Sequence, residues 1–337
     1  MHITHICEDK IKLDLNDKKI LKELDLNSRQ SNTAIAKATR LSKNIVNYRI
    51  KRMEDEGIIE GYTTTFDYSK LGYLLVRVYF DFYETDQKKE DELINFLIND
   101  QKTSRISRAS GKWDVIASFF VKDIYEFSDH WSKILGRFRS LIKEYSSNII
   151  TRDISFRKAY LIGETEDISH LSWKKGCSTP EQIDETDLII LKMLTENARM
   201  PIEKIAASTG LGSMAIIYRI KQLIKKKIIL GYRVNINFSK LGYEFYKVNL
   251  ELEDTTIIPS LIEYCHRHPN IISVVESISD NIDFEFNIEP ANFNDFLKVI
   301  DDLKQKFYGK IRDYNYVKSL KSYKHVYLPL DTIIKKS

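Results

Sequence analysis

Apolar residues near the start of the chain recur at the spacing of three short helices. The three groups are Ile20, Leu21 and Leu24; Ile35 and Ala36; and Val46, Ile50 and Met53. A short turn at residues 39–41 precedes the third group, where Ser42 suits the cap position and Gly57 suits the end. Three helices with a tight turn before the third predict a helix-turn-helix unit.

Strand and helix patterns then follow in the order β-α-β-β-α-β. The expected elements are residues 74–82, 91–98, 104–109, 113–121, 124–138 and 145–157. Alternating strands with two crossing helices predict a ferredoxin-like sensor domain.

The whole pattern occurs twice. Residues 14–73 align with residues 184–243 without a gap, and about 25 of the 60 pairs are identical. The second copy repeats the helical stripe at Ile216, Ile220 and Leu223, with Gly210 in the turn. Its sensor elements are expected at residues 245–252, 258–266, 271–278, 284–288, 293–307 and 311–318. The predicted fold class is α+β: two winged helix-turn-helix units, each followed by a ferredoxin-like βαββαβ sensor domain.

The expected domains are a first helix-turn-helix unit at residues 12–62 and a first sensor domain at 63–162. A linker at 163–181 is followed by a second helix-turn-helix unit at 182–232 and a second sensor domain at 233–330.

The third helix of the first copy is the predicted DNA-binding element. With Val46 facing the core, Asn44, Asn47, Tyr48 and Lys51 fall on the opposite face. Asparagine can pair bidentately with adenine, and lysine can reach guanine or phosphate. The predicted DNA contacts of this copy are Ser42, Lys43, Asn44, Asn47, Tyr48, Arg49, Lys51 and Arg52, with the flanking cations on phosphates.

The second copy has a different outer face. Its predicted contacts are Ser213, Tyr218, Arg219, Lys221 and Lys225, but Met214 and Ile217 replace hydrogen-bonding residues. Residues 204–243 hold eight Lys or Arg and no Asp or Glu, a pattern typical of phosphate binding. We therefore expect the second copy to bind DNA with less sequence discrimination, or to pack Met214 and Ile217 against another protein surface.

These motifs resemble the Lrp/AsnC family of transcription regulators. The likeness rests mainly on residues 15–21, 35–36, 41–42, 49–59 and 61–62, and less fully on 183–187, 205–206, 211 and 218–220. The resemblance implies a regulator that binds double-stranded DNA and self-associates through its sensor domains, often with an amino-acid effector. A fused pair could form that association internally, as a pseudo-dimer, or could assemble further with other chains. We then expect a DNA site without full palindromic symmetry.

The resemblance also points to an effector loop. The family's Gly-x-x-Asp pattern matches Gly111, Trp113 and Asp114 in the first copy, although a simple turn and a pocket filled by Trp113 are equally consistent with it. The second copy reads Asp280-Asn281-Ile282-Asp283, so it keeps the acid and loses the glycine. A small amino-acid-like effector is therefore expected only in the first copy.

An enzyme on the same fold is the main alternative. Sirohaem decarboxylases share this two-domain plan, but the stretch that should meet the tetrapyrrole, residues 107–114, has no His. Four other histidines, His130, His170, His266 and His268, are scattered. A pure small-molecule or protein-interaction module is a third hypothesis. We predict no enzymatic activity, no cofactor and no metal site.

Composition and cysteine spacing bear mainly on the cellular compartment in which the protein is expected. The net charge is +4 and the three cysteines, Cys7, Cys177 and Cys265, show no metal or disulfide spacing. No apolar run approaches the length of a membrane span and no signal-peptide pattern begins the chain, so a reduced, cytoplasmic protein without membrane contact is expected.

Overall fold

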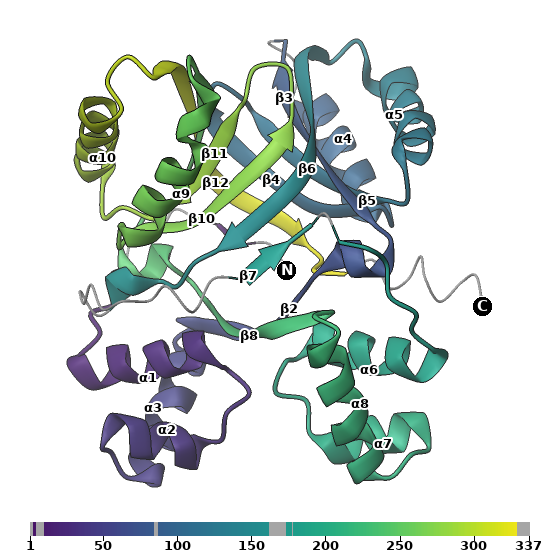
Figure 1. The fold of residues 1–337 in the computed structure, drawn as a ribbon, viewed down its shortest axis with the longest axis vertical. Helices are drawn as coiled ribbons and strands as arrows, with labels where there is room; N and C mark the ends of the chain where they lie inside the picture. Colours follow the sequence, from purple (N-terminus) through teal and green to yellow (C-terminus); the bar gives the residue numbers. More distant parts are fainter. Residues whose placement is uncertain (1–2, 5–9, 84–86, 162–172, 177, 329–337) are drawn as a thin grey trace.

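The structure, a computed structural model, describes residues 3–4, 10–83, 87–161, 173–176 and 178–328. Each copy begins with a three-helix bundle. In the first copy the helices are α1 (Leu15–Leu26), α2 (Asn32–Thr39) and α3 (Lys43–Asp55). In the second they are α6 (Glu185–Glu196), α7 (Ile202–Thr209) and α8 (Ser213–Lys225). The bundles lie side by side at one end of the molecule (Figure 1). Within the described residues, no helix is long and apolar enough to cross a bilayer.

A two-stranded ribbon joins the bundles. Strands β2 (Ile59–Phe66) and β8 (Ile229–Ile236) pair antiparallel, with Thr63 opposite Arg233. These two positions are equivalent in the repeat, so a local two-fold axis passes through the ribbon. Each strand packs on the other copy's bundle: Val234 and Ile236 enter the first core, and Phe66 enters the second. The ribbon crosses the expected domain boundaries at residues 62 and 232.

The two sensor units each hold four main strands and two helices. The first contains β3 (Leu74–Phe82), α4 (Gln87–Asn99), β4 (Thr103–Gly111), β5 (Val115–Val121), α5 (Ile124–Phe138) and β6 (Ile142–Ser155). The second contains β9 (Tyr246–Leu252), α9 (Ile258–Arg267), β10 (Ile271–Ile278), β11 (Phe284–Ile288), α10 (Phe293–Lys306) and β12 (Ile311–His325). Short segments complete the fold: strands β1 (Ile3–Thr4) and β7 (Trp173–Lys175), and 3-10 turns η1 (Tyr68–Leu71), η2 (Ala159–Leu161), η3 (Ser239–Leu241) and η4 (Thr255–Ile257).

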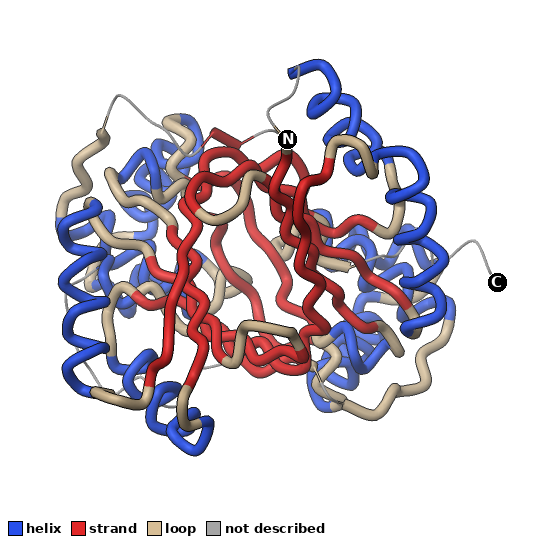
Figure 2. Tube along the Cα trace, turned by 90° about the horizontal axis from the view of Figure 1, so that it is seen from above, coloured by secondary structure: helices blue, strands red, loops and turns tan. Residues whose placement is uncertain are grey.

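The sensor strands close into a barrel. Their order is β12-β4-β5-β3-β6-β10-β11-β9, and β9 returns to pair with β12. The copies meet at two seams, β6 with β10 and β4 with β12, where each seam joins the second strand of one unit to the last strand of the other. Viewed end-on, the strands form a ring with helices on two flanks (Figure 2). The chain thus pairs its own sensor domains internally.

The alternation along the strands separates two environments. Val76, Val78 and Phe80 of β3 point outward into a core with α4 and α5, while Arg77 and Tyr79 point inward. In the second copy Phe284, Phe286 and Ile288 of β11 enter the core with α9 and α10, and Glu285 and Asn287 point inward. On these two strands, apolar residues therefore lie outside the ring and residues with polar groups lie inside it.

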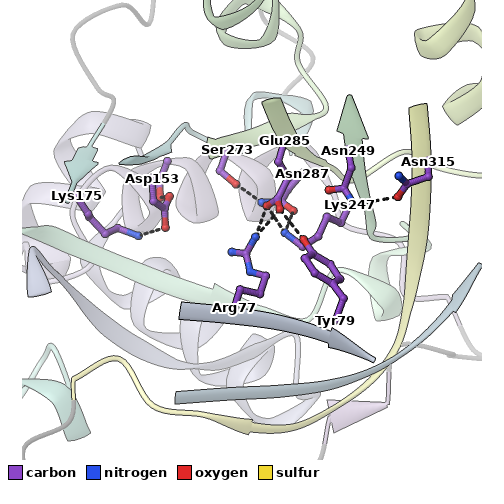
Figure 3. Close-up of polar contacts among 11 residues, drawn as sticks. Arg77, Tyr79, Asp153, Lys175, Lys247, Asn249, Ser273, Glu285, Asn287 and Asn315 are labelled. Carbon is purple, nitrogen blue, oxygen red and sulfur yellow. Dashed lines mark hydrogen bonds and ion pairs between the residues drawn. The ribbon is translucent and has the colours of Figure 1, made fainter. Parts of the chain in front are cut away.

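Buried polar residues hold the two copies together inside the barrel (Figure 3). Arg77 Nη1 lies 2.5 Å from both carboxylate oxygens of Glu285, and Tyr79 donates to Oε2 of the same carboxylate at 2.7 Å. Lys247 also donates to Glu285, and donates to Asn287 Oδ1 at 2.9 Å. Burial alone would raise the pKa of Glu285, but the charges of Arg77 and Lys247 outweigh it and lower that pKa to about 2.

The sequence-derived elements agree well with the structure. Residues 74–82, 124–138, 271–278 and 284–288 are confirmed with the same ends. The strand expected at 311–318 is longer and reaches His325, because its second half forms the seam with β4. Cys265 is buried and unpaired, whereas Cys7, Cys177, His170 and linker residues 163–172 lie outside the described residues.

Candidate nucleic-acid interface

Helix α3 presents a polar face to solvent. The Ser42 side chain caps it by accepting a hydrogen bond from the Ile45 amide at 3.2 Å. Val46, Ile50 and Met53 are buried against the rest of the bundle, which confirms the expected core stripe. The outer face consists of Ser42, Lys43, Asn44, Asn47, Tyr48 and Lys51, all exposed. These predicted DNA-contact residues are therefore gathered on one accessible surface, the outer face of α3.

Arg49 and Arg52 do not share that surface. Arg49 Nη1 lies 2.7 Å from Asp14 Oδ2 and 2.8 Å from Asp17 Oδ1, and Arg52 Nη2 lies 2.6 Å from Asp17 Oδ2. Asp14 and Asp17 also form the capping box of α1. These hydrogen bonds raise the pKa of Arg49, and the amide of Asp17 together with Arg49 lowers the pKa of Asp14. Arg49 and Arg52 therefore fasten α3 to α1, and their contact with phosphates remains a prediction.

The same clamp occurs in the second copy. Arg219 Nη1 lies 2.7 Å from Asp184 Oδ2 and 2.9 Å from Asp187 Oδ1 at the start of α6. Arg219 is therefore also an internal clamp residue, and its phosphate contact remains a prediction. The periodicity placed these arginines at the edge of the outer face, but it could not show that acids of another helix reach them.

Asn47 is linked to the second copy through a chain of side-chain hydrogen bonds. Arg199, which follows α6, donates to Asn32 Oδ1 at 2.6 Å, and Asn32 Nδ2 donates to Asn47 Oδ1 at 2.7 Å. Because a guanidinium can only donate, it fixes the orientation of both amides. Asn47 therefore turns its oxygen toward Asn32, and its Nδ2 donor has no hydrogen-bond partner among the described residues.

This orientation changes the expected base contact. Bidentate pairing with adenine uses the amide oxygen as well as the amide nitrogen, so an oxygen that already accepts from Asn32 would have to accept a second hydrogen bond. With the oxygen held by Asn32, Asn47 is suited to donate to a base-edge acceptor, such as guanine N7 or O6 or thymine O4. Ile202 and Ile217 occupy the equivalent positions in the second copy, so it lacks this chain.

Helix α8 presents a different surface. Ile216, Ile220 and Leu223 are buried as expected, and Met214 and Tyr218 are 78% and 62% exposed. Ser213, Lys221 and Lys225 are exposed as well, while Ile217 is half-buried. The predicted residues are thus accessible apart from the clamped Arg219. The outer face of α8 joins an apolar patch to lysines.

The lysines of the two helices differ in their partners. Lys51 on α3 donates a hydrogen bond to Asp55 at 2.6 Å, and this hydrogen bond raises the pKa of Lys51. Lys221, Lys225 and Lys227 make no ion pair with any described residue, while Lys226 donates to the Gln182 carbonyl at 2.7 Å. The second copy therefore offers more uncompensated positive charge at its helix than the first.

The predicted effector residues are packed rather than open. Gly111 has φ +119° at the end of β4, and a Cβ there would lie 2.6 Å from the Tyr316 carbonyl of β12. Trp113 is 5% exposed and packs with Tyr79 and Ile282, so it fills the space expected for a ligand. Asp114 accepts from the Phe82 amide at 2.9 Å, and burial raises its pKa.

Asp283 shows that the acid of this loop is structural. It accepts from the Leu252 amide at 2.7 Å, as Asp114 does from Phe82. Both carboxylates therefore hold a β-turn against the first strand of their own sensor unit. This shared role accounts for the acid in both copies without an effector, and the expectation of a ligand at Gly111, Trp113 and Asp114 remains a prediction.

Comparison with known proteins finds relatives of both helix-turn-helix units. Residues 13–60 match the winged helix-turn-helix DNA-binding family, and residues 183–224 match the AsnC-type helix-turn-helix domain. An uncharacterised helix-turn-helix transcriptional regulator of Pyrococcus furiosus is 32% identical over 106 residues, covering 32% of this chain and 70% of that protein. This chain belongs to the Lrp/AsnC family of transcriptional regulators.

Other relatives match a shorter region. The transcriptional regulator LrpA of Pyrococcus horikoshii is 44% identical over 66 residues, which is 20% of this Lrp/AsnC chain and 47% of LrpA. The LrpA of Pyrococcus abyssi is 42% identical over the same length and also matches over 47% of its own length. The chain thus spans about half the length of these curated relatives.

One solved structure matches the tandem architecture along nearly its whole length. The siroheme decarboxylase NirDL superposes with a TM-score of 0.64 and 13% identity, covering 95% of this Lrp/AsnC chain and 97% of NirDL. At this identity the likeness concerns the fold.

Within the described residues, no group of three or more His, Cys, Asp or Glu could hold a metal ion.

Proposed function

We propose that this protein is a transcription regulator that binds duplex DNA through α3 and α8. The observation that carries the proposal is the exposed amide and lysine face of α3 in a capped helix-turn-helix unit. The N-terminal half of such a recognition helix enters the major groove. Asn44 and Asn47 lie in that half, and the acids Glu54, Asp55 and Glu56 lie at the far end.

In this proposal the two helix-turn-helix units make different kinds of contact with DNA. The local two-fold axis at Thr63 and Arg233 relates the two recognition helices, as the two-fold of a dimer relates the helices on a duplex. The outer face of α3 can donate to base edges, whereas that of α8 holds lysines for phosphates and apolar groups for a thymine methyl. The preferred site therefore has one defined half and one loosely defined half.

Selection of bound fragments from a random duplex library tests this proposal. Sequencing the fragments reports one conserved half-site if α3 reads bases and α8 does not. Asn47→Ala should reduce the preference for the selected site over random duplex roughly five- to tenfold, as expected for a lost base contact. Ile217→Ala, at the equivalent position, should leave that preference unchanged.

Two results would contradict the proposal. Equal relaxation by Asn47→Ala and Ile217→Ala would show that α3 has no special reading role. Duplex binding that does not weaken with salt would remove the phosphate contribution that DNA binding requires.

The enzyme alternative has its own discriminating measurement. The whole-length likeness to NirDL concerns architecture, and the family membership and the outer face of α3 favour regulation over catalysis. Mixing the protein with an iron tetrapyrrole and recording the absorption spectrum distinguishes the two functions. A stoichiometric shift of the tetrapyrrole bands would support an enzyme, and an unchanged spectrum would support a regulator.

A further inference from the structure

A cavity of about 340 Å³ lies between one end of the barrel and the β2–β8 ribbon. Its walls include Arg105 and Ser107 of β4, Ser322 and His325 of β12, and Thr63 of β2. This volume falls at the lower end of the range for small-molecule sites in proteins. The apolar cluster around Trp113 fills a different part of the barrel, near the β4–β5 turn.

Most cations that line this cavity have an acidic partner. Arg77 pairs with Glu285, Lys175 with Asp153 at 2.9 Å, and Lys158 with Glu289 at 2.5 Å. Arg233 Nε lies 3.7 Å from Asp25 Oδ1. The positive charges of these four residues are therefore balanced within the protein.

Arg105 differs from these four cations. Its Nη2 lies 2.6 Å from His325 Nε2, and it makes no ion pair with a carboxylate in the part of the chain that the structure describes. Burial, Arg105 and Lys175 lower the pKa of His325 well below its ordinary value, so the imidazole is neutral and accepts from the guanidinium. Arg105 thus presents to the cavity a guanidinium that is exposed there and that no hydrogen-bonded carboxylate of a described residue neutralises; the nearby charges of Asp153 and Glu285 act on it without an ion pair.

Hydroxyl groups lie beside this guanidinium. In the β4–β12 seam Ser107 is opposite Ser322, and Arg105 is opposite His325. Both serines line the cavity, and neither hydroxyl has a hydrogen bond to a described residue. Guanidinium and hydroxyl donors on one wall form the kind of donor set that binds carboxylate or phosphate groups.

We propose that this cavity binds a small anion, with a carboxylate or phosphate group held by Arg105, Ser107 and Ser322. The donors come from both copies, so the site exists only in the fused, closed barrel. The loop at Gly111 and Trp113 plays no part in it.

The ligand would also meet the ribbon that joins the two DNA-binding units. Thr63, Thr65 and Arg233 line the opposite wall, while Phe66 and Val234 of the same strands enter the helix-turn-helix cores. An anion that binds one ribbon geometry better than another would shift the relation between α3 and α8. This regulatory step rests on the proposed function, whereas the anion site itself does not.

Calorimetric titration of the full chain with inorganic phosphate and, separately, succinate tests the site. We expect saturable binding of at least one probe, and the stronger one indicates whether phosphate or carboxylate is preferred. Arg105→Gln should weaken that binding by roughly tenfold or more, the effect of losing a charged hydrogen-bond donor. Arg108→Gln is the matched control, because Arg108 pairs with Glu90 at 2.5 Å on the same strand.

The thermal midpoint of the ligand-free protein provides a second readout. Because the Arg105 side chain is exposed to the cavity and has no ion pair with a described residue to lose, Arg105→Gln should leave the midpoint nearly unchanged, whereas breaking the ion pair with Glu90 in Arg108→Gln should lower it. Absence of saturable binding of both probes, or equal binding by wild type and Arg105→Gln, would overturn the site. A midpoint lowered by Arg105→Gln as much as by Arg108→Gln would show that Arg105 serves the stability of the seam rather than anion binding.

Duplex affinity measured with and without the bound probe tests the regulatory step. A change of threefold or more that disappears in Arg105→Gln supports it, and an unchanged affinity with the probe bound overturns it alone. Failure of the wild type to bind duplex without any probe contradicts the proposed function and leaves the anion site standing.

Discussion

The two helix-turn-helix units share a backbone plan but differ in the chemistry of their recognition helices. Both place three apolar residues inward and clamp an arginine to acids at the start of the first helix. On the outer face, α3 carries amides with a neutralised Lys51, and α8 carries Met214 with lysines that form no ion pair with a described residue. The two copies therefore share the apolar stripe and the clamp and also keep Tyr48 and Lys51 as Tyr218 and Lys221. They differ at Asn44 and Asn47, where the second copy has Met214 and Ile217.

The difference also extends to how the units influence each other. Arg199 of the second copy fixes the amides of Asn32 and Asn47 in the first, whereas Arg29, its equivalent, hydrogen-bonds the Ala198 carbonyl. The second copy thus orients Asn47, a residue predicted to contact bases, and the first copy does not orient an equivalent residue of the second. A single chain can hold such asymmetry, whereas identical subunits related by symmetry cannot.

Neutralising the lysines of the second copy should produce the largest effect. Replacing Lys221, Lys225 and Lys227 by Gln removes three phosphate-binding charges from α8 and its end. Because each phosphate contact contributes about 0.9 to the slope of log affinity against log salt, the slope should fall by roughly 2.7. Affinity near physiological salt should fall about a hundredfold. Fluorescence anisotropy of a labelled duplex over a salt series measures both quantities.

The matched control changes the first copy. Lys43→Gln combined with Lys51→Gln should alter the slope by no more than about one contact, since Asp55 already neutralises Lys51. Equal slopes for the two variants would show that the copies bind phosphate alike.

Allowing the Asn47 amide to rotate should change the base preference more than the affinity for duplex DNA. In Arg199→Met, the donor that orients Asn32 is lost and both amides can turn, so Asn47 can present its oxygen and accept from adenine N6. We expect a shift toward adenine at one position of the selected site, with an affinity change of about two- to fivefold. Library selection followed by sequencing measures the shift.

Arg29→Met is the control at the equivalent position. It removes a contact between the copies but touches neither amide. The orientation argument fails if Arg29→Met shifts the base preference as Arg199→Met does, or if Arg199→Met leaves it unchanged.

The sequence predicts local elements well because their periodicity records which side chains are buried. The stripe at Val46, Ile50 and Met53, the cap at Ser42 and most strand ends follow from it. It does not predict the closed barrel, because alternation cannot distinguish a polar side chain in solvent from one inside a ring. Arg77 and Glu285, 208 positions apart in the chain, pair inside that ring.

The candidate site shows the same limit. Periodicity identified the outward position of Asn47, but the link through Asn32 to Arg199 joins residues 167 positions apart. Periodicity also places Arg49 and Arg52 beside the outer face, but it cannot reveal the acids of α1 that they contact. The cavity at Arg105 and His325 was missed entirely, since neither residue belongs to a recognisable motif.

Left-handed backbone positions give the smallest and most closely matched test of the two copies. Arg40 at the turn has φ +57° where the second copy has Gly210, and Lys227 after α8 has φ +59° where the first copy has Gly57. A side chain in this region costs about 1–2 kcal/mol, and glycine's greater freedom in the unfolded chain offsets part of that cost. Each copy therefore has an arginine or lysine in a strained backbone conformation at a position where the other copy has glycine.

Replacing these cations should stabilise the fold and weaken DNA binding. Arg40→Gly and Lys227→Gly should each raise the free energy of unfolding by about 0.5–1 kcal/mol, measured by urea denaturation. Gly210→Arg, where an added Cβ has no neighbour within 4 Å, should lower it by a similar amount. If Lys227 is kept in this conformation because it binds a phosphate, Lys227→Gly should also reduce the slope of log affinity against log salt by about 0.9. A stabilised variant with an unchanged slope would mean that Lys227 does not contact DNA.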